Sequence, residues 1–229
     1  MMFPFLDPTF VLLIPAMILA LWAQSKVHRT YARFSEIRSA SGLTGADVAR
    51  RILNLNGLTG VEVEAVPGNL TDHYDPRSRT VRLSEGIYRH GSVAALGIAA
   101  HEVGHAVQHA QGYAALKLRH ALLLPAQFGS NLAIPFFFVG LIFSSMKILM
   151  DIGIFLFLGA LVFQLITLPV EFDASRRALA MLRGTGLMMD NEVADARKVL
   201  NAAAWTYVAA VAMAVSQLLR LLLLRSSRD

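Results

Sequence analysis

Two histidines and a glutamate near the middle of the chain have the types and the spacing of a divalent metal site. They form the sequence His101-Glu102-Val103-Gly104-His105, an H-E-x-x-H motif. Residues four apart in a helix lie on one face about one turn apart, so both imidazoles can reach the same Zn²⁺. Glu102, beside the first histidine, can accept a proton from a water molecule at the metal. The motif therefore predicts a hydrolytic zinc site with Glu102 as the general base.

The motif alone does not complete this site, because a catalytic zinc ion takes a third protein ligand and keeps one position for water. In metzincins the third ligand is a histidine six residues after the second, but Gln111 stands there in this chain. His109 is four residues beyond His105, too far along a straight helix to share an ion with His101. We expect His109 to be a surface histidine or one that supports a ligand.

Glu171 is the better candidate for the third ligand. Two apolar runs separate it from His105, and two membrane crossings return a chain to the side from which it left. Glu171 begins the segment after the second of these runs, in the sequence E-F-D-A-S-R at residues 171–176. The alternative explanation is an acidic residue that complements the dipole at a helix N-terminus.

The composition indicates a membrane protein. Hydrophobic residues make up 55% of the 229 residues, and only 16% are charged. The net charge of +5 would suit nucleic acid, but the basic residues cluster beside apolar runs, a pattern typical of a membrane surface. The chain has no cysteine, which excludes disulfides and thiolate metal ligands.

Four apolar runs are candidates for membrane-spanning helices, at about residues 8–24, 121–146, 148–169 and 205–224. The first has no basic segment before it, so we expect an uncleaved anchor and not a signal peptide. The second and third are joined by almost no loop and predict a transmembrane hairpin. In the fourth, Arg220 either extends to the membrane interface or indicates a helix that lies partly in the membrane plane.

The basic residues also predict the orientation. Lys26, Arg29 and Arg33 follow the first run. The positive-inside rule therefore places residues 25–120 in the cytoplasm. The C-terminal tail disagrees with this rule, because a complete fourth span would place Arg225 outside.

Residues 25–120 form the largest stretch outside these runs, and capping residues, β-branched alternation and turn residues predict its elements. We expect helices over residues 26–41, 44–55 and 92–112, a strand over 61–66 and a hairpin over 72–83. The last of these helices carries the H-E-x-x-H motif. The hairpin strand near residues 80–83 could pair with an extended substrate by strand addition.

Together these features predict a mainly α membrane protein, with about four transmembrane helices and a small α+β, zincin-like cytoplasmic domain that carries the H-E-x-x-H helix. The predicted parts are an N-terminal membrane anchor (1–24), a cytoplasmic catalytic region (25–120), a transmembrane hairpin (121–169), a cytoplasmic helical segment with the third metal ligand (170–203) and a C-terminal membrane helix (204–229).

The H-E-V-G-H motif, followed across the hairpin by E-F-D-A-S-R, resembles the YugP-type neutral zinc metallopeptidases of bacterial membranes. It is similar more distantly to the HtpX-type membrane gluzincins, in which a downstream E-F-x-A-D-R motif supplies the third ligand. The first likeness covers nearly the whole chain, including the segments T-D-H-Y-D-P and L-N-A-A-A-W-T-Y-V-A-A. It implies one Zn²⁺ per chain, bound by His101, His105 and Glu171, with Glu102 as the catalytic base.

One departure from the HtpX pattern concerns the residues that support the ligands. Ser175 stands where that motif has an aspartate expected to orient a ligating histidine. Asp173 is the nearest carboxylate, but it is offset from Ser175 by about 200° around the helix. Metal ligands normally have such partners, so the supporting residue stays open. Further candidates for ligand support or for stabilising an oxyanion are His73, Tyr74, His109, Tyr113 and Arg176.

The resemblance implies a peptidase of the bacterial inner membrane that hydrolyses peptide bonds of protein substrates at or near the bilayer. The expected partners are a protein or peptide substrate and lipid, and no nucleic acid. A zinc-binding membrane scaffold without turnover is the main alternative, although such a protein would usually lose the general base, and Glu102 is present. A metal transporter is less favoured, because a mixed soluble region flanks the motif.

Overall fold

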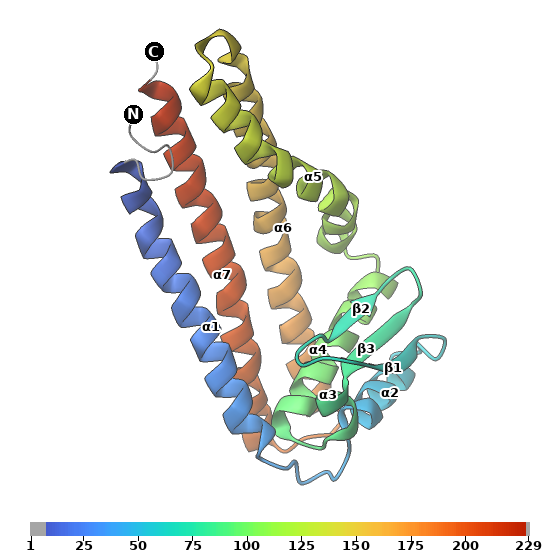
Figure 1. The fold of residues 1–229 in the computed structure, drawn as a ribbon. Helices are drawn as coiled ribbons and strands as arrows, with labels where there is room; N and C mark the ends of the chain where they lie inside the picture. Colours follow the sequence, from blue (N-terminus) through green and yellow to red (C-terminus); the bar gives the residue numbers. More distant parts are fainter. Residues whose placement is uncertain (1–7, 228–229) are drawn as a thin grey trace. The chain divides into compact units, whose positions relative to one another are not determined.

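The computed structural model describes residues 8–227, except for the side chain of Ser144. The first seven residues of the predicted anchor and the last two of the predicted C-terminal helix lie outside this range. The protein is mostly helical, with one small mixed sheet (Figure 1). It divides into two compact units. The helical unit comprises residues 1–24, 117–168 and 205–229, and the mixed unit comprises residues 25–116 and 169–204.

Within the described residues, four helical segments are long and apolar enough to cross a membrane. They are the 3₁₀ turn η1 (Pro8–Leu13) with α1 (Ile14–Ser35), α5 (Ala114–Ile142), α6 (Ile148–Gly184) and α7 (Asp190–Ser226). The four apolar runs of the sequence are therefore all helical. The prediction that the chain is organised into five parts stays a prediction.

α6 and α7 are each 37 residues long, whereas about 20 residues suffice to span the bilayer. Pro169 does not end α6, because the helix continues through it to Gly184. Neighbouring helices allow a proline inside such a helix. Glu171 therefore lies in the interior of a helix, and the explanation of Glu171 as a helix N-terminal acid is wrong.

In the helical unit, α5 and α6 are joined by the short 3₁₀ turn η2 (Ser144–Met146) and pack closely. A Cβ on Gly153 would lie 2.6 Å from the carbonyl oxygen of Ala133, so glycine permits this approach. Arg225 Nε lies 2.8 Å from Asp151 Oδ1, so the basic tail that disagreed with the positive-inside rule is paired with an acid. Arg220 is buried and lies over the ring of Phe10.

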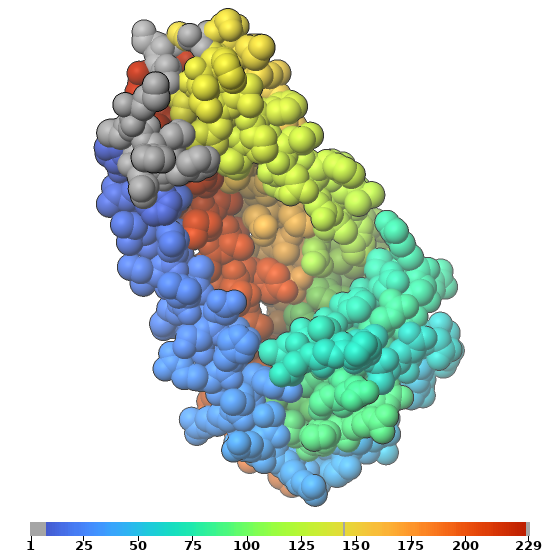
Figure 2. Space-filling model, in the orientation of Figure 1, coloured from blue at the N-terminus to red at the C-terminus, as the bar shows by residue number. Residues whose placement is uncertain are grey.

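The mixed unit contains three strands, β1 (Glu62–Val66), β2 (His73–Asp75) and β3 (Thr80–Ser84). β3 is the central strand, parallel to β1 and antiparallel to β2 (Figure 1). Figure 2 shows the strand segment, in turquoise, at the surface of this unit. Because both edges of β3 are occupied, the idea that a substrate strand pairs with residues 80–83 is wrong.

The helices of the mixed unit include α2 (Gly45–Leu55), α3 (Glu85–Arg89) and α4 (Val93–Ala110). The helix predicted from residue 44 forms as α2, and Thr44 caps its start in a capping box with Asp47. The predicted helix over residues 26–41 is too long, since α1 ends at Ser35. The chain after it instead joins the segment before α4, where the N–H of Ser39 donates to the carbonyl oxygen of Gly91 at 2.8 Å.

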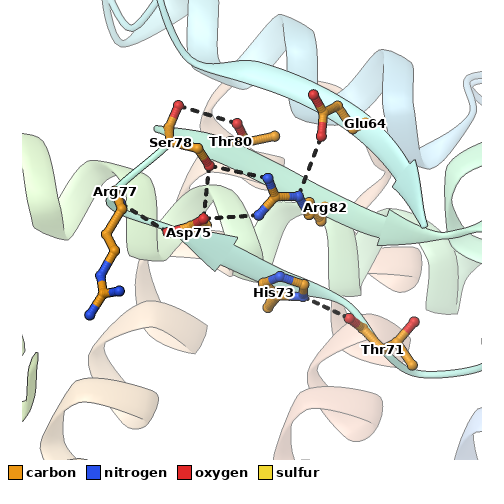
Figure 3. Close-up of polar contacts among 8 residues, drawn as sticks. All are labelled: Glu64, Thr71, His73, Asp75, Arg77, Ser78, Thr80 and Arg82. Carbon is orange, nitrogen blue, oxygen red and sulfur yellow. Dashed lines mark hydrogen bonds and ion pairs between the residues drawn. The ribbon is translucent and has the colours of Figure 1, made fainter. Parts of the chain in front are cut away.

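Arg82 connects all three strands on one face of the sheet (Figure 3). Its guanidinium group lies 3.0 Å from Asp75 on β2 and 3.3 Å from Glu64 on β1. Asp75 also accepts from the N–H of Arg77 and the hydroxyl of Ser78, which closes the turn of the hairpin. The other face carries Val81, which is fully buried in the core of the unit.

Candidate metal centre

α4 carries the H-E-x-x-H residues and is largely buried. The Ser92 hydroxyl accepts from the N–H of Ala95 at 3.2 Å and caps its start. Gly112, with φ +67°, terminates it in the left-handed conformation that glycine favours. The predicted helix over residues 92–112 therefore forms, with its caps where the sequence placed them.

His101, His105 and Glu171 converge on one point. Glu171 Oε2 lies 3.3 Å from His101 Nε2 and 3.5 Å from His105 Nε2. A tetrahedral zinc ion with bonds of about 2.1 Å separates its ligand atoms by about 3.4 Å. The three donor atoms thus have the chemistry and the spacing that Zn²⁺ requires, and the residues fit the ion.

The close approach of α4 and α6 depends on Gly104, inside the motif. A Cβ at this position would lie 2.6 Å from the carbonyl oxygen of Ala174 on α6. Glu171 and Ser175 lie near Ala174 on the same helix. The absence of a side chain on Gly104 therefore lets α6 approach closely enough for both residues to reach the histidines. The glycine of the motif is thus required for the geometry of the site.

Each histidine has a hydrogen-bond partner for its second ring nitrogen. Ser175 Oγ lies 3.1 Å from His101 Nδ1. Gln108 Oε1 lies 3.0 Å from His105 Nδ1. Asp173 contacts neither histidine, but accepts from Gln108 Nε2 at 2.9 Å. Such partners orient metal-ligating imidazoles, so both Nδ1 atoms are engaged while both Nε2 atoms face Glu171.

Glu102 is buried beside the ligands. This burial raises the pKa of Glu102 to about 7. The charges of Glu171 and Asp72 add to the rise, while His101 and a hydrogen bond from the backbone of Tyr74 oppose it. A carboxyl group with a pKa near neutrality is suited to accepting and releasing a proton.

The remaining sequence candidates lie in different places. The Tyr74 hydroxyl is 2.8 Å from His109 Nδ1, so these two residues form a pair that joins β2 to α4. His73 is exposed beside the carbonyl oxygen of Thr71, on the sheet face that carries Arg82 (Figure 3). The structure therefore does not bring His73 to the histidines of the motif.

On α6, the side chain of Arg176 is 78% exposed and forms an ion pair with Asp173. Arg177 pairs with the same carboxylate and lies over the ring of Tyr113. These residues form the outer end of the polar chain that begins at His105.

Sequence reasoning missed Gln108. It lies three residues after His105, and residues at that spacing share a helix face. This spacing was the available signal, but the partners of Gln108 on α6 depend on how the two helices pack.

Residues 9–226 match the model of the family described as "Putative neutral zinc metallopeptidase". The "Putative membrane protease YugP" of Bacillus subtilis (strain 168) is 48% identical over 213 residues, which cover 93% of this chain and 94% of that protein. No solved structure matches the chain. The family match covers nearly the whole chain, and the similar protein from Bacillus subtilis agrees with it. The chain therefore belongs to the neutral zinc metallopeptidase family.

Proposed function

We propose that the protein is a membrane-embedded zinc metallopeptidase that hydrolyses peptide bonds of protein substrates at or near the bilayer. The observation that carries this proposal is the convergence of two imidazoles and a carboxylate at the spacing of zinc ligands. The four apolar helical segments and the protease name of the Bacillus subtilis relative support the membrane setting and the reaction class.

In this mechanism His101 and His105 would hold one zinc ion through Nε2, and Glu171 would hold it through a carboxylate oxygen. The ion, when bound, would supply a lowered pKa of water and polarisation of the peptide carbonyl group. Glu102 takes the proton from the attacking water and passes it to the leaving amine, as a general base and then a general acid. The ligand arrangement, two histidines and a glutamate, is that of a gluzincin.

Replacing the general base tests this mechanism. Glu102→Gln keeps the size of the side chain but removes its basicity. We expect cleavage of an unfolded protein substrate to fall by at least about 100-fold, while zinc content stays equal to that of the wild type. Glu85→Gln, on the exposed start of α3, is the matched control.

Two outcomes would contradict the proposal. Undiminished cleavage by Glu102→Gln would exclude Glu102 as the base. Stoichiometric zinc in the wild type without chelator-sensitive cleavage would favour a zinc-binding membrane scaffold.

We also propose that the mixed unit faces the cytoplasm, on the basis of the basic residues that follow the first apolar run. The absence of cysteines allows single cysteines to be introduced without background. An impermeant maleimide should label Ser145→Cys, in the turn between α5 and α6, on intact cells. It should label Asn69→Cys, in the exposed loop after β1, only after lysis. The reverse pattern would overturn this orientation.

A further inference from the structure

Gln108 is completely buried, and every hydrogen-bonding atom of its carboxamide group is engaged. Its Nε2 donates to the carbonyl oxygen of Val170 at 2.8 Å and to Asp173 Oδ2 at 2.9 Å. Its Oε1 lies 3.0 Å from His105 Nδ1. The side chain therefore links the second histidine of the motif directly to α6.

The partners on α6 fix which way the carboxamide points. The carbonyl oxygen of Val170 has no proton to donate, and Asp173 is held as a carboxylate by ion pairs with Arg176 and Arg177. Both groups can only accept, so they require the NH₂ end of Gln108. The oxygen end must then face His105.

This orientation favours one tautomer of His105. A carboxamide oxygen only accepts hydrogen bonds, so the contact with Gln108 requires a proton on Nδ1. The carboxylate of Glu171, 3.5 Å from Nε2, is also an acceptor, and without a metal ion it competes for the single proton of a neutral imidazole. A metal ion on Nε2 would take the lone pair of the Nδ1–H tautomer, so Gln108 favours the form that binds metal.

His101 is held differently. Its Nδ1 contacts the hydroxyl of Ser175 at 3.1 Å, and a hydroxyl group can donate or accept. Ser175 therefore orients the ring of His101 but does not select its tautomer. The two ligating histidines differ in how far their partners fix their protonation.

Gln108 also sets the position of Glu171 along α6. Val170 directly precedes Glu171, and Asp173 follows two residues later, so the two hydrogen bonds from Gln108 bracket the third ligand. One buried side chain thus controls both a histidine ligand on α4 and the place of the carboxylate ligand opposite it.

We propose that Gln108 is a positioning residue of the metal centre, which favours the Nδ1–H tautomer of His105 and holds Glu171 at its position along α6. This inference rests on the proposed zinc site. The preference of His105 can be measured without metal once the competing carboxylate of Glu171 is removed.

The first test is the tautomer of His105 in metal-free Glu171→Ala protein in detergent, in which no carboxylate at position 171 competes for the proton. Nitrogen-15 NMR of histidine-labelled protein at alkaline pH, where the imidazoles are neutral, reports which ring nitrogen carries the proton. The His105 signal is assigned by its loss in His105→Asn. We expect the proton on Nδ1, and a proton on Nε2 would overturn the proposal.

The second test is zinc affinity, measured by competition with a chromophoric chelator. Gln108→Leu removes the hydrogen bonds at similar volume and should weaken zinc binding by about 10- to 100-fold. Gln111→Leu is the matched control, because Gln111 also contacts α6, through Arg177, but not His105. Equal affinity in Gln108→Leu and Gln111→Leu would overturn the proposal.

These readouts separate the two possible failures. If the wild type binds no zinc, the proposed function fails, and the tautomer of His105 in Glu171→Ala still decides the role of Gln108. If Gln108→Leu does not fold, that tautomer again gives the answer, since the measurement requires no variant of Gln108.

Discussion

Two polar networks of the mixed unit both contain carboxylates but differ in the groups that face those carboxylates. The sheet network, centred on Arg82, joins a cation to the carboxylates of Asp75 and Glu64 at the edge of solvent. The metal-site network directs a carboxylate and two imidazole nitrogens toward one buried point. The first balances its own charges. The second gathers electron-pair donors, which a divalent cation would complement.

This difference distinguishes a structural ion pair from a set of candidate metal ligands. Ion pairs near solvent contribute little to stability, so the sheet network serves mainly to align its strands. Buried polar groups are costly unless they are paired. The metal-ligating atoms that α4 and α6 direct toward one buried point therefore indicate a bound ligand. Substitutions in the metal-site network should therefore weaken metal binding, whereas substitutions in the sheet network should leave it unchanged.

The largest effect should come from removing the third ligand. Glu171→Ala leaves only two protein donors, so we expect loss of stoichiometric zinc and of proteolysis together. Zinc content is measured on purified protein by elemental analysis. Glu64→Ala, which removes a carboxylate from the sheet network, should keep both. Normal zinc binding by Glu171→Ala would show that another residue supplies the third ligand.

A smaller effect is expected where the two helices touch. The Cβ of Gly104→Ala would lie 2.6 Å from the carbonyl oxygen of Ala174, so α6 must move away from α4. Overpacking of this kind costs about 1–3 kcal/mol and should also weaken zinc binding, because Glu171 moves with α6. Thermal unfolding and zinc titration measure the two effects.

Gly159→Ala is the matched control, since a Cβ at that position on α6 meets nothing within 4 Å. If Gly104→Ala bound zinc as tightly as Gly159→Ala, the spacing of the helices would not control the site.

The sequence was sufficient where a signal is local. The helices expected from residues 44 and 92 form with Thr44 and Ser92 as their caps, and the hairpin over residues 72–83 forms. Glu171 was placed beside the histidines by counting membrane crossings, and the structure brings these side chains together.

Features that depend on packing could not be read from the sequence. The continuation of α6 through Pro169 depends on neighbouring helices, and the central place of β3 depends on pairing with a strand distant in the chain. The role of Gln108 arises from atoms 62 and 65 positions away. Periodicity and capping report neighbours in sequence, and they do not report which face of one helix meets another.

The smallest effect should come from Arg82→Ala in the sheet network. Hydrogen bonds from the backbone of Arg77 and from the side chains of Arg82 and Ser78 hold the pKa of Asp75 well below its usual range. The stability that this carboxylate contributes is fully present above the unfolded-state pKa of about 3.9, and it is lost as the pH falls further. The variant should therefore melt slightly below the wild type at neutral pH, and the difference should shrink in acid.

Zinc affinity and cleavage should be unchanged in Arg82→Ala, because its partners lie on the sheet face away from α4. A marked loss of zinc affinity with intact folding would contradict the separation of the two networks. It would mean that the register of β2, which places Tyr74 against Glu102 and His109, transmits the state of the sheet to the metal centre.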